Sequence, residues 1–347
     1  MKNPFWNREQ RRVRALWRLV AQGLLFFVAM VVPCAVAGIV LGPVLIARSG
    51  GALAADPAAL AQALVSHPLF SVLNRIVPLL AVFGSVWLAG RFLDRRRFAD
   101  FGFHLGRGWW LDLAFGLGLG AVLMAGIFAV ELAAGWVRIT GTLQPRLAGQ
   151  AFLPGILLAL AGFVGVGIYE ELLSRGYQLR NMAEGLNGRL LGTRGAVLVA
   201  WLVSSSVFGL LHAANPNATI VSTANLVVAG LFLGLAFVLT GELAIPIGLH
   251  ITWNFFQGNV FGFPVSGGQA GATFIAIAQG GPALWTGGAF GPEAGLIGIA
   301  AIVAGSGLIV LWVRARQGRV AIFGQLSQAP QQAPVQPAEP GTYEAPS

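Results

Sequence analysis

Long apolar runs separated by short charged stretches are the main pattern along this chain. Runs of about 20 nearly uncharged residues recur, and a helix needs about this length to cross a hydrocarbon core of about 30 Å. We place spans at residues 20–47, 69–90, 110–136, 153–179, 198–218, 222–240, 243–262 and 294–313. The pattern predicts an all-α fold, a polytopic transmembrane helix bundle of about eight spans.

Composition supports a lipid environment. Apolar residues make up 56% of the chain and charged residues only 10%, whereas soluble domains carry about 25% charged residues. The single cysteine, Cys34, excludes a disulfide and a cysteine-based metal site within the chain. The net charge of +9 does not indicate nucleic acid, because the basic residues lie at predicted helix ends rather than on one patch. We expect the lipid bilayer as a partner and no nucleic acid.

The basic residues also predict the orientation. With eight spans and the N-terminus inside, 18 of the 22 Lys and Arg residues fall on the cytoplasmic side. Only Arg48, Arg138 and Arg146 fall outside. Because cytoplasmic loops are enriched in Lys and Arg, both termini are predicted to be cytoplasmic, N-in and C-in.

Three regions follow from this pattern. Residues 1–18 are basic with interleaved tryptophans and predict a short interfacial helix on anionic lipid. Residues 19–320 form the bundle, with a motif core at 150–262, and the Pro/Gln-rich residues 321–347 are expected to be a disordered tail. The Gly-rich stretch 262–295 has three open interpretations: an outer lid, a shallow re-entrant segment or a flexible loop.

Polar residues interrupt three of the predicted spans, where they are costly and indicate function. They are Glu170, Glu171 and Arg175 in the fourth span, Phe208 and His212 in the fifth, and His250 and Asn254 in the seventh. Each pair four residues apart shares a helix face. Taken singly, these residues have simpler interpretations: a surface ion pair, or hydrogen bonds between helices. Their presence on three spans favours one common site.

Helix geometry sets a condition for such a site. At 1.5 Å per residue, Glu170 lies about 15 Å from Arg180, and His212 lies about 16 Å from Trp201 but about 27 Å from Arg194. The residues converge if 181–200 lies along the membrane surface, and we adopt this arrangement. Adjacent glutamates point about 100° apart, so Glu170 and Glu171 cannot share one role, and helix phase allows either to face the cavity.

The residue types fit hydrolysis of an amide bond. A glutamate held in low dielectric is a competent general base near neutral pH. With a histidine on a facing helix it could orient and deprotonate a water molecule. A second histidine and an asparagine amide could then donate to the oxyanion that develops. The set predicts an amide hydrolase inside the membrane, and we expect no metal and no cofactor.

The spacing of these residues resembles a known family. Glu170-Glu171-Leu-Leu-Ser-Arg175 resembles the EExxxR motif of the CAAX-processing and bacteriocin-processing (CPBP, or Abi) family of intramembrane glutamic endopeptidases. Phe208-Gly-Leu-Leu-His212 resembles its FxxxH motif, and His250-Ile-Thr-Trp-Asn254 its HxxxN motif. The resemblance covers about residues 85–262.

The resemblance implies a role for each motif residue. Glu170 would be the catalytic glutamate and His212 its partner in activating water, while His250 and Asn254 would form the oxyanion hole. Glu171, Arg175 and Phe208 would support the site. Ser174 departs from the pattern, since many members carry an aromatic residue before the Arg-Gly pair, and this affects the shape of the nearby pocket.

The implied substrate is a membrane-embedded or lipid-tethered peptide, and the Arg-rich composition suggests a bacterial plasma membrane. One alternative is a zinc protease with Glu170, His212 and His250 as ligands, although the HExxH signature is absent. A non-catalytic transporter or scaffold is a second, although the halves show no clear internal repeat. An inactive family member that binds a partner is a third.

Overall fold

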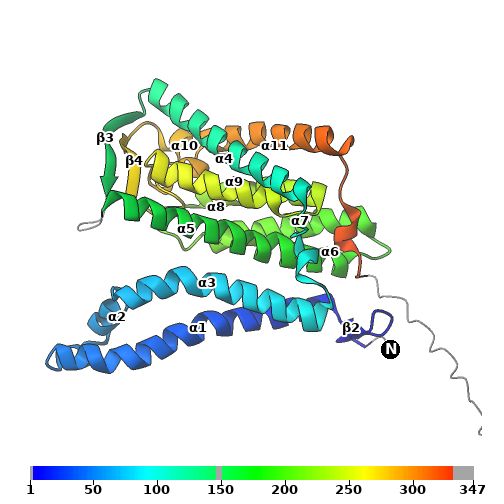
Figure 1. Ribbon diagram of the computed structural model, residues 1–347, viewed down its shortest axis with the longest axis horizontal. Helices are drawn as coiled ribbons and strands as arrows, with labels where there is room; N and C mark the ends of the chain where they lie inside the picture. Colours follow the sequence, from blue (N-terminus) through cyan, green and yellow to red (C-terminus); the bar gives the residue numbers. More distant parts are fainter. Residues whose placement is uncertain (1–2, 146–150, 331–347) are drawn as a thin grey trace, which may run out of the picture.

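Long helices running side by side dominate the computed structural model, which describes residues 3–145 and 151–330 (Figure 1). The long helices are α1 (Ala15–Arg48), α3 (Pro68–Leu88), α4 (Arg107–Ala133), α5 (Phe152–Glu171), α7 (Gly192–Leu211), α8 (Ile220–Thr240) and α11 (Leu296–Gln317). In the described part of the chain, seven helices are long and apolar enough to cross a membrane. This confirms a polytopic all-α bundle.

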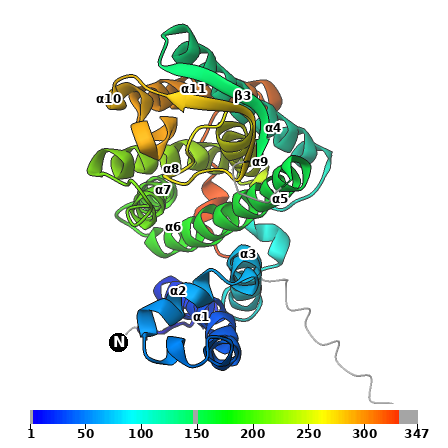
Figure 2. The same ribbon diagram turned by 90° about the vertical axis from the view of Figure 1, so that its left-hand side faces the viewer.

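The predicted span 243–262 is shorter than expected. It consists of α9 (Ala244–Phe255) and a π-helical turn, η5 (Phe256–Val260). Nine of the 12 residues of α9 are buried, and it packs against α4, α5 and α8 in the interior of the bundle (Figure 2). A helix enclosed by other helices is as apolar as one that faces lipid, so the sequence pattern alone does not separate the two cases.

Glycines bring α4 and α9 into close contact. A Cβ atom on Gly116 would lie 3.0 Å from the backbone nitrogen of Leu249, and one on Gly248 would lie 2.7 Å from that of Leu117. Since real Cβ atoms are hardly ever this close to backbone atoms, these positions hold glycine so that the two helix backbones can approach. The close approach fixes the height and rotation of α9.

The N-terminal residues differ from the predicted interfacial helix. They form a short antiparallel pair, β1 (Trp6–Asn7) with β2 (Arg12–Val13), before α1 begins. Arg12 and Arg18 are buried, and Arg18 binds Asp94 at 2.9 Å and Glu184 at 2.7 Å. Burial lowers the pKa of Arg12 to about 10. Part of the basic charge therefore pairs with carboxylates inside the protein rather than with lipid.

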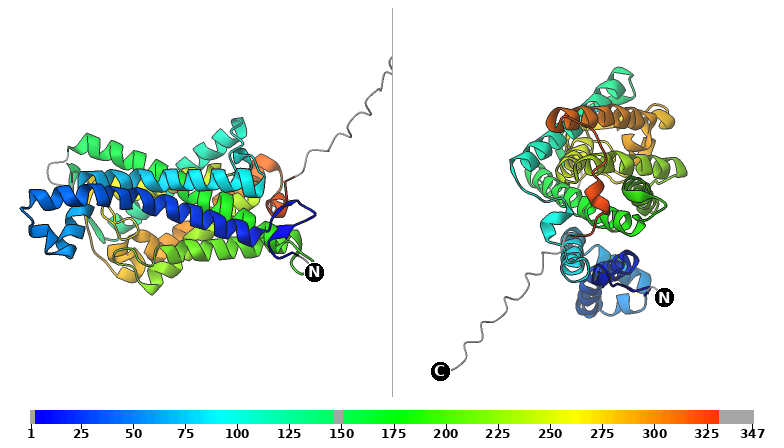
Figure 3. Two further views of the ribbon diagram at one scale, coloured as in Figure 1. Left: turned by 90° about the horizontal axis from the view of Figure 1, so that it is seen from below. Right: turned by 90° about the vertical axis from the view of Figure 1, so that its right-hand side faces the viewer.

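Helices α1 and α3, with the short α2 (Pro57–Val65) between them, form a hairpin beside the rest of the bundle (Figures 2 and 3). α1 packs along α3, and near its N-terminal end it contacts α6 (Arg180–Leu186). Most side chains of α1 are exposed, as expected for a helix that faces lipid.

The Gly-rich stretch 262–295 is an ordered cover over one end of the bundle. Its strand β4 (Ala272–Gln279) pairs antiparallel with β3 (Val137–Pro145), with an irregularity between Ile139 and Gly141. The short helix α10 (Ala283–Thr286) and the 3₁₀ turns η6 (Gly288–Phe290) and η7 (Pro292–Ala294) complete it. This order disagrees with a flexible loop, and the lid and the re-entrant segment both stay predictions.

Both described ends of the chain lie at the opposite end of the bundle from this cover (Figure 1). Residues 324–327 form a 3₁₀ turn, η8, in which Leu326 is fully buried and the Ser327 carbonyl accepts a hydrogen bond from Asn187. The prediction of a disordered tail is therefore wrong for residues 321–330. Its remainder, residues 331–347, lies outside the described residues.

Candidate active site

A cavity of about 530 Å³ between α5, α7, α8 and α9 brings the predicted polar residues together. Glu170, His212, His250 and Asn254 all line it, and the rest of its wall is mostly apolar. Residues from three helices that are far apart in sequence therefore share one chamber.

The residues converge by a different route from the one expected. α7 begins at Gly192, so residues 181–200 do not lie along a surface. Instead, α5 continues through the π-helical turn η4 (Leu172–Leu179) and α6 to Leu186, and α6 packs against α7. At 1.5 Å per residue, Glu170 lies about 24 Å from Leu186, where α6 ends, and His212 lies about 30 Å from Gly192, where α7 begins. These two helix ends are on the same side of the bundle, so Glu170 and His212 are close enough in depth to share a cavity.

The two adjacent glutamates have different environments. The Glu170 side chain is 24% exposed and lines the cavity. Glu171 is fully buried, and its Oε1 accepts hydrogen bonds from Nη1 of Arg175 and Nδ1 of His250, both at 2.9 Å. Glu170 is thus the glutamate that faces the cavity.

Arg175 connects three elements around the cavity. Its Nη2 donates to the Gly230 carbonyl of α8 at 2.9 Å, and its guanidinium carbon lies 4.5 Å from the centre of the Phe208 ring. Arg175 lies in η4, and π-helical turns occur often at functional sites because they rotate side chains out of the regular helical phase. Gly176 follows, where a Cβ atom would lie 2.9 Å from the Phe101 carbonyl oxygen. Arg175 therefore supplies the charge that pairs with Glu171, and Gly176 leaves room for the backbone of Phe101.

His250 lies between the two carboxylates. Because an ionised carboxylate only accepts hydrogen bonds, Nδ1 carries the proton that is donated to Glu171. Nε2 lies 3.9 Å from Oε2 of Glu170. When the ring holds both protons, Nε2 is a donor directed toward the site.

His212 has its protonated nitrogen in the same position as His250. It caps the C-terminal end of α7, and its Nδ1 lies 2.8 Å from the Phe208 carbonyl oxygen. A carbonyl oxygen only accepts, so Nδ1 donates, and Nε2 of the neutral ring keeps a free lone pair. In either histidine, Nε2 can take up a proton while the ring is neutral and donate one once the ring holds both protons.

The sequence analysis missed Glu293, which also lines the cavity from η7. Its Oε1 accepts from the Ser266 backbone N–H at 2.6 Å, and its Oε2 contacts the Gln257 amide. Burial raises the pKa of Glu293 to about 7. The available signal was an isolated acidic residue in the Gly-rich stretch 262–295.

The residues of the zinc alternative do not form a metal-binding cluster. Across residues 3–145 and 151–330, no group of three or more His, Cys, Asp or Glu side chains has an arrangement that could hold a metal ion. Nδ1 of His250 is occupied by Glu171, and Nδ1 of His212 by a backbone carbonyl. Nε2 of both rings stays free, and it is the placement of the described side chains, not these hydrogen bonds, that disfavours a metal site.

Comparison with known families agrees with the motifs. Residues 151–256 match the family described as type II CAAX prenyl endopeptidase Rce1-like, and this range contains all three motifs. No curated protein and no solved structure matches the chain. The family match supports a protease, and the seven described helices that could cross a membrane make the chain a multi-pass membrane protein. Residues 151–256 of this membrane protein therefore form an Rce1-like domain of the CAAX-processing and bacteriocin-processing protease family.

Proposed function

We propose that this protein is an intramembrane glutamic endopeptidase in which Glu170 activates the water molecule that attacks a peptide bond. The observation that carries the proposal is the position of Glu170, partly exposed in a largely apolar cavity that it shares with His212, His250 and Asn254. A carboxylate there has few competing water contacts and is available as a general base.

The reaction begins with a water molecule between Glu170 and Nε2 of His212. As its oxygen bonds to the carbonyl carbon of the substrate, one proton passes to this pair. Nε2–H of His250 and the side-chain amide of Asn254 donate to the oxyanion of the tetrahedral intermediate. The C–N bond then breaks, and the stored proton goes to the departing amine.

Glu171, Arg175 and Phe208 act as positioning residues. The buried carboxylate of Glu171 fixes the ring orientation of His250, and Arg175 balances its charge. Phe208 packs against Arg175, and its ring centre lies 4.8 Å from that of His212. These contacts hold donor and base in place before substrate arrives, which favours the transition state.

The cavity wall supports an apolar substrate. Phe163, Leu226 and Phe232 face the same chamber as Glu170, and Phe26 of α1 reaches it from the hairpin. We propose a membrane-embedded or lipid-tethered peptide as substrate. The composition, rich in arginine with a single lysine, supports a bacterial plasma membrane. The distribution of the arginines along the chain supports both termini on the cytoplasmic side.

The test is cleavage of a library of lipidated and hydrophobic peptides by purified protein in nanodiscs. Wild type, Glu170→Gln and His212→Ala are compared with and without a strong chelator, and Glu9→Gln, at an exposed position, is the matched control. We expect chelator-resistant cleavage that is lost in both site variants and kept in the control. Loss on chelation with rescue by zinc would support the metalloprotease instead. Full activity of Glu170→Gln would refute the proposal.

A further inference from the structure

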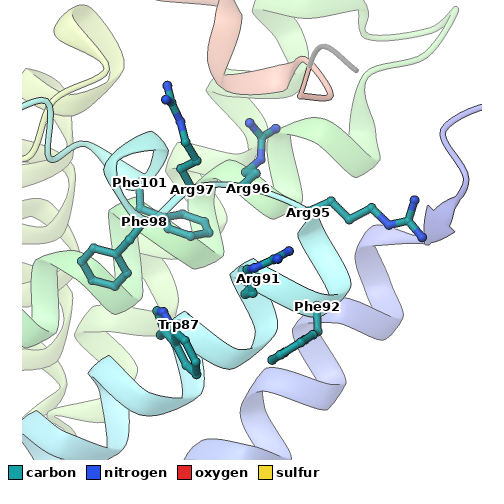
Figure 4. Close-up of a pocket in the computed structure, with 9 residues that line it drawn as sticks. Trp87, Arg91, Phe92, Arg95, Arg96, Arg97, Phe98 and Phe101 are labelled. Carbon is teal, nitrogen blue, oxygen red and sulfur yellow. The ribbon is translucent and has the colours of Figure 1, made fainter. Parts of the chain in front are cut away.

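A second pocket, of about 550 Å³, lies where α3 ends, at the same end of the bundle as the N-terminus (Figures 1 and 4). Its lining includes Arg91, Arg95, Arg96 and Arg97 together with the aromatic residues Trp87 and Phe92. It shares no lining residue with the cavity of the candidate active site. The proposed protease function therefore does not explain it.

The backbone places the four arginines around one turn, from which their side chains point in different directions (Figure 4). The π-helical turn η2 (Ala89–Asp94) extends α3, and Arg95 then adopts a left-handed conformation with a φ of 55°. This conformation is unfavourable for residues other than glycine and turns the chain sharply into the 3₁₀ turn η3 (Phe98–Phe101). Arg91 precedes the turn, and Arg96 and Arg97 follow it.

The positive charge in this pocket is mostly unbalanced. Arg96 binds Glu184 at 2.9 Å and the Gln328 carbonyl at 2.6 Å. Among the described residues, Arg91, Arg95 and Arg97 form no ion pair. No aspartate or glutamate lines the pocket.

Two carboxylates lie close to these arginines, and both have other partners. Asp100 accepts a hydrogen bond from the Arg97 backbone N–H at 3.0 Å. Asp94 is fully buried and binds Arg18 and the Tyr177 hydroxyl. Neither carboxylate lines the pocket, so an anion entering it would meet guanidinium groups first.

The aromatic wall indicates which anion. Trp87 is 53% exposed and Phe92 is 63% exposed, and their rings meet edge to face at 6.3 Å. Both lie on the helix formed by α3 and η2, which could cross the membrane, and exposed aromatic residues beside arginines are typical of the membrane–water interface. A small soluble phosphate would not use this wall, whereas a phosphate attached to acyl chains would.

We propose that this pocket binds the headgroup of an anionic phospholipid. Arg91, which lies between the aromatic pair and the other arginines (Figure 4), contacts the phosphate, and Arg95 and Arg97 add positive charge on either side of it. Trp87 and Phe92 contact the start of the acyl chains. Arginine is well suited to this role because its planar guanidinium donates two parallel hydrogen bonds to phosphate oxygens.

The occupied pocket would also stabilise the attachment of the α1–α3 hairpin. Arg96 on its edge shares Glu184 with Arg12 and Arg18, so one carboxylate joins the α3 end, the N-terminal strand β2 and α1 to α6. A ligand that binds only the folded protein raises the unfolding temperature. Binding can therefore be followed both directly and through stability.

The test is native mass spectrometry of the full-length protein in neutral detergent, with phosphatidylglycerol or phosphatidylcholine added. We expect selective retention of phosphatidylglycerol and a higher unfolding temperature with this lipid alone. The triple variant Arg91→Gln/Arg95→Gln/Arg97→Gln should bind about 100-fold more weakly, given about fivefold per arginine near the membrane surface. A matched triple variant, Arg189→Gln/Arg194→Gln/Arg319→Gln, removes three exposed arginines that do not line the pocket and should keep the selectivity.

Two further arms separate lipid from other ligands. Trp87→Ala/Phe92→Ala should weaken retention of phosphatidylglycerol while leaving all four arginines in place. Inorganic phosphate or glycerol phosphate that raised the unfolding temperature as much as the lipid would identify a soluble ligand and overturn the proposal. Equal retention of both lipids by wild type, or unchanged selectivity in the Arg91 triple variant, would also overturn it.

Discussion

Glu171 and His250 are joined by a hydrogen bond of 2.9 Å between Oε1 and Nδ1, and Arg175 donates to the same carboxylate oxygen. All three side chains are buried. The second glutamate of the pair therefore cannot reach the cavity, and it fixes which nitrogen of His250 faces Glu170. The two adjacent glutamates thus have separate environments, and in the proposed function only Glu170 takes part in the chemistry.

Glu171→Gln should destabilise the protein far more than Glu170→Gln. The substitution leaves the buried guanidinium of Arg175 without its counter-charge, and breaking a buried ion pair costs about 3–5 kcal/mol. Glu170 is partly exposed to the cavity, so its amide variant should unfold close to the wild-type temperature. Thermal unfolding of both variants in the same detergent tests this. Equal unfolding temperatures would contradict the assignment of the two environments.

Arg175→Lys should not preserve the site, although it keeps the charge. Arg175 binds Glu171 through one nitrogen and the Gly230 carbonyl through another, with its planar group over Phe208. An ammonium group cannot make all three contacts, and we expect a loss of about 2–3 kcal/mol in the free energy of unfolding. Chemical denaturation measures it. A lysine variant as stable as wild type would show that the charge alone is sufficient.

Gly120→Ala should displace α9, while Gly118→Ala on the same helix should not. A Cβ atom at Gly120 would meet Thr252 and lie 2.6 Å from the Leu249 carbonyl oxygen, whereas nothing lies within 4 Å of one at Gly118. Replacing glycine by alanine in a helix otherwise stabilises by about 1 kcal/mol.

The two alanine variants should therefore shift the unfolding temperature in opposite directions. Because α9 carries His250 and Asn254, cleavage should also fall in Gly120→Ala. Shifts of the same sign would contradict the close packing of α4 on α9.

Glu293 should make the stability of the cover depend on pH. Its folded-state pKa of about 7 lies above the ordinary value of 4.5, so the folded protein binds this proton more tightly than the unfolded chain does. Stability should fall as the pH rises from about 4.5 to about 7, by about 3 kcal/mol, and be constant above that.

The variant Glu293→Gln isolates this contribution, because the amide does not titrate. Unfolding temperatures at pH 5 and pH 8 should differ more in wild type than in the variant. The same difference in both proteins would show that other groups cause the pH dependence.

Glu184→Gln should release the N-terminal hairpin. One carboxylate pairs with Arg12, Arg18 and Arg96, and its loss leaves buried guanidinium groups without their partner. Limited proteolysis should then cleave within the first strands, and the unfolding temperature should drop. Glu9→Gln, at an exposed position nearby, is the control. Equal protease resistance in both variants would contradict this attachment.

The long helices could be predicted because a run of about 20 apolar residues has few alternatives to a membrane span. α9 could not be distinguished from a span, since burial in protein and burial in lipid select the same residues. The partners of Arg18, Asp94 and Glu184, are 76 and 166 residues away, so a local pattern of basic residues suggested lipid instead.

The sequence predicts which residues belong to the candidate site, but it does not predict how they are arranged. Helix phase placed His250 and Asn254 on one face, yet it left Glu170 and Glu171 equivalent. The structure separates them because Arg175 and His250 both approach Glu171, and no spacing rule contains that information. Glu293 was missed because it reaches the cavity from the cover rather than from a long helix.

The most direct test of the central claim is the cleavage rate of one identified peptide by wild type and by Glu170→Gln in the presence of a chelator. Both samples must show the same unfolding temperature. If Glu170 is the general base, the rate should fall by about 100-fold or more. An unchanged rate in a folded Glu170→Gln variant would contradict the account.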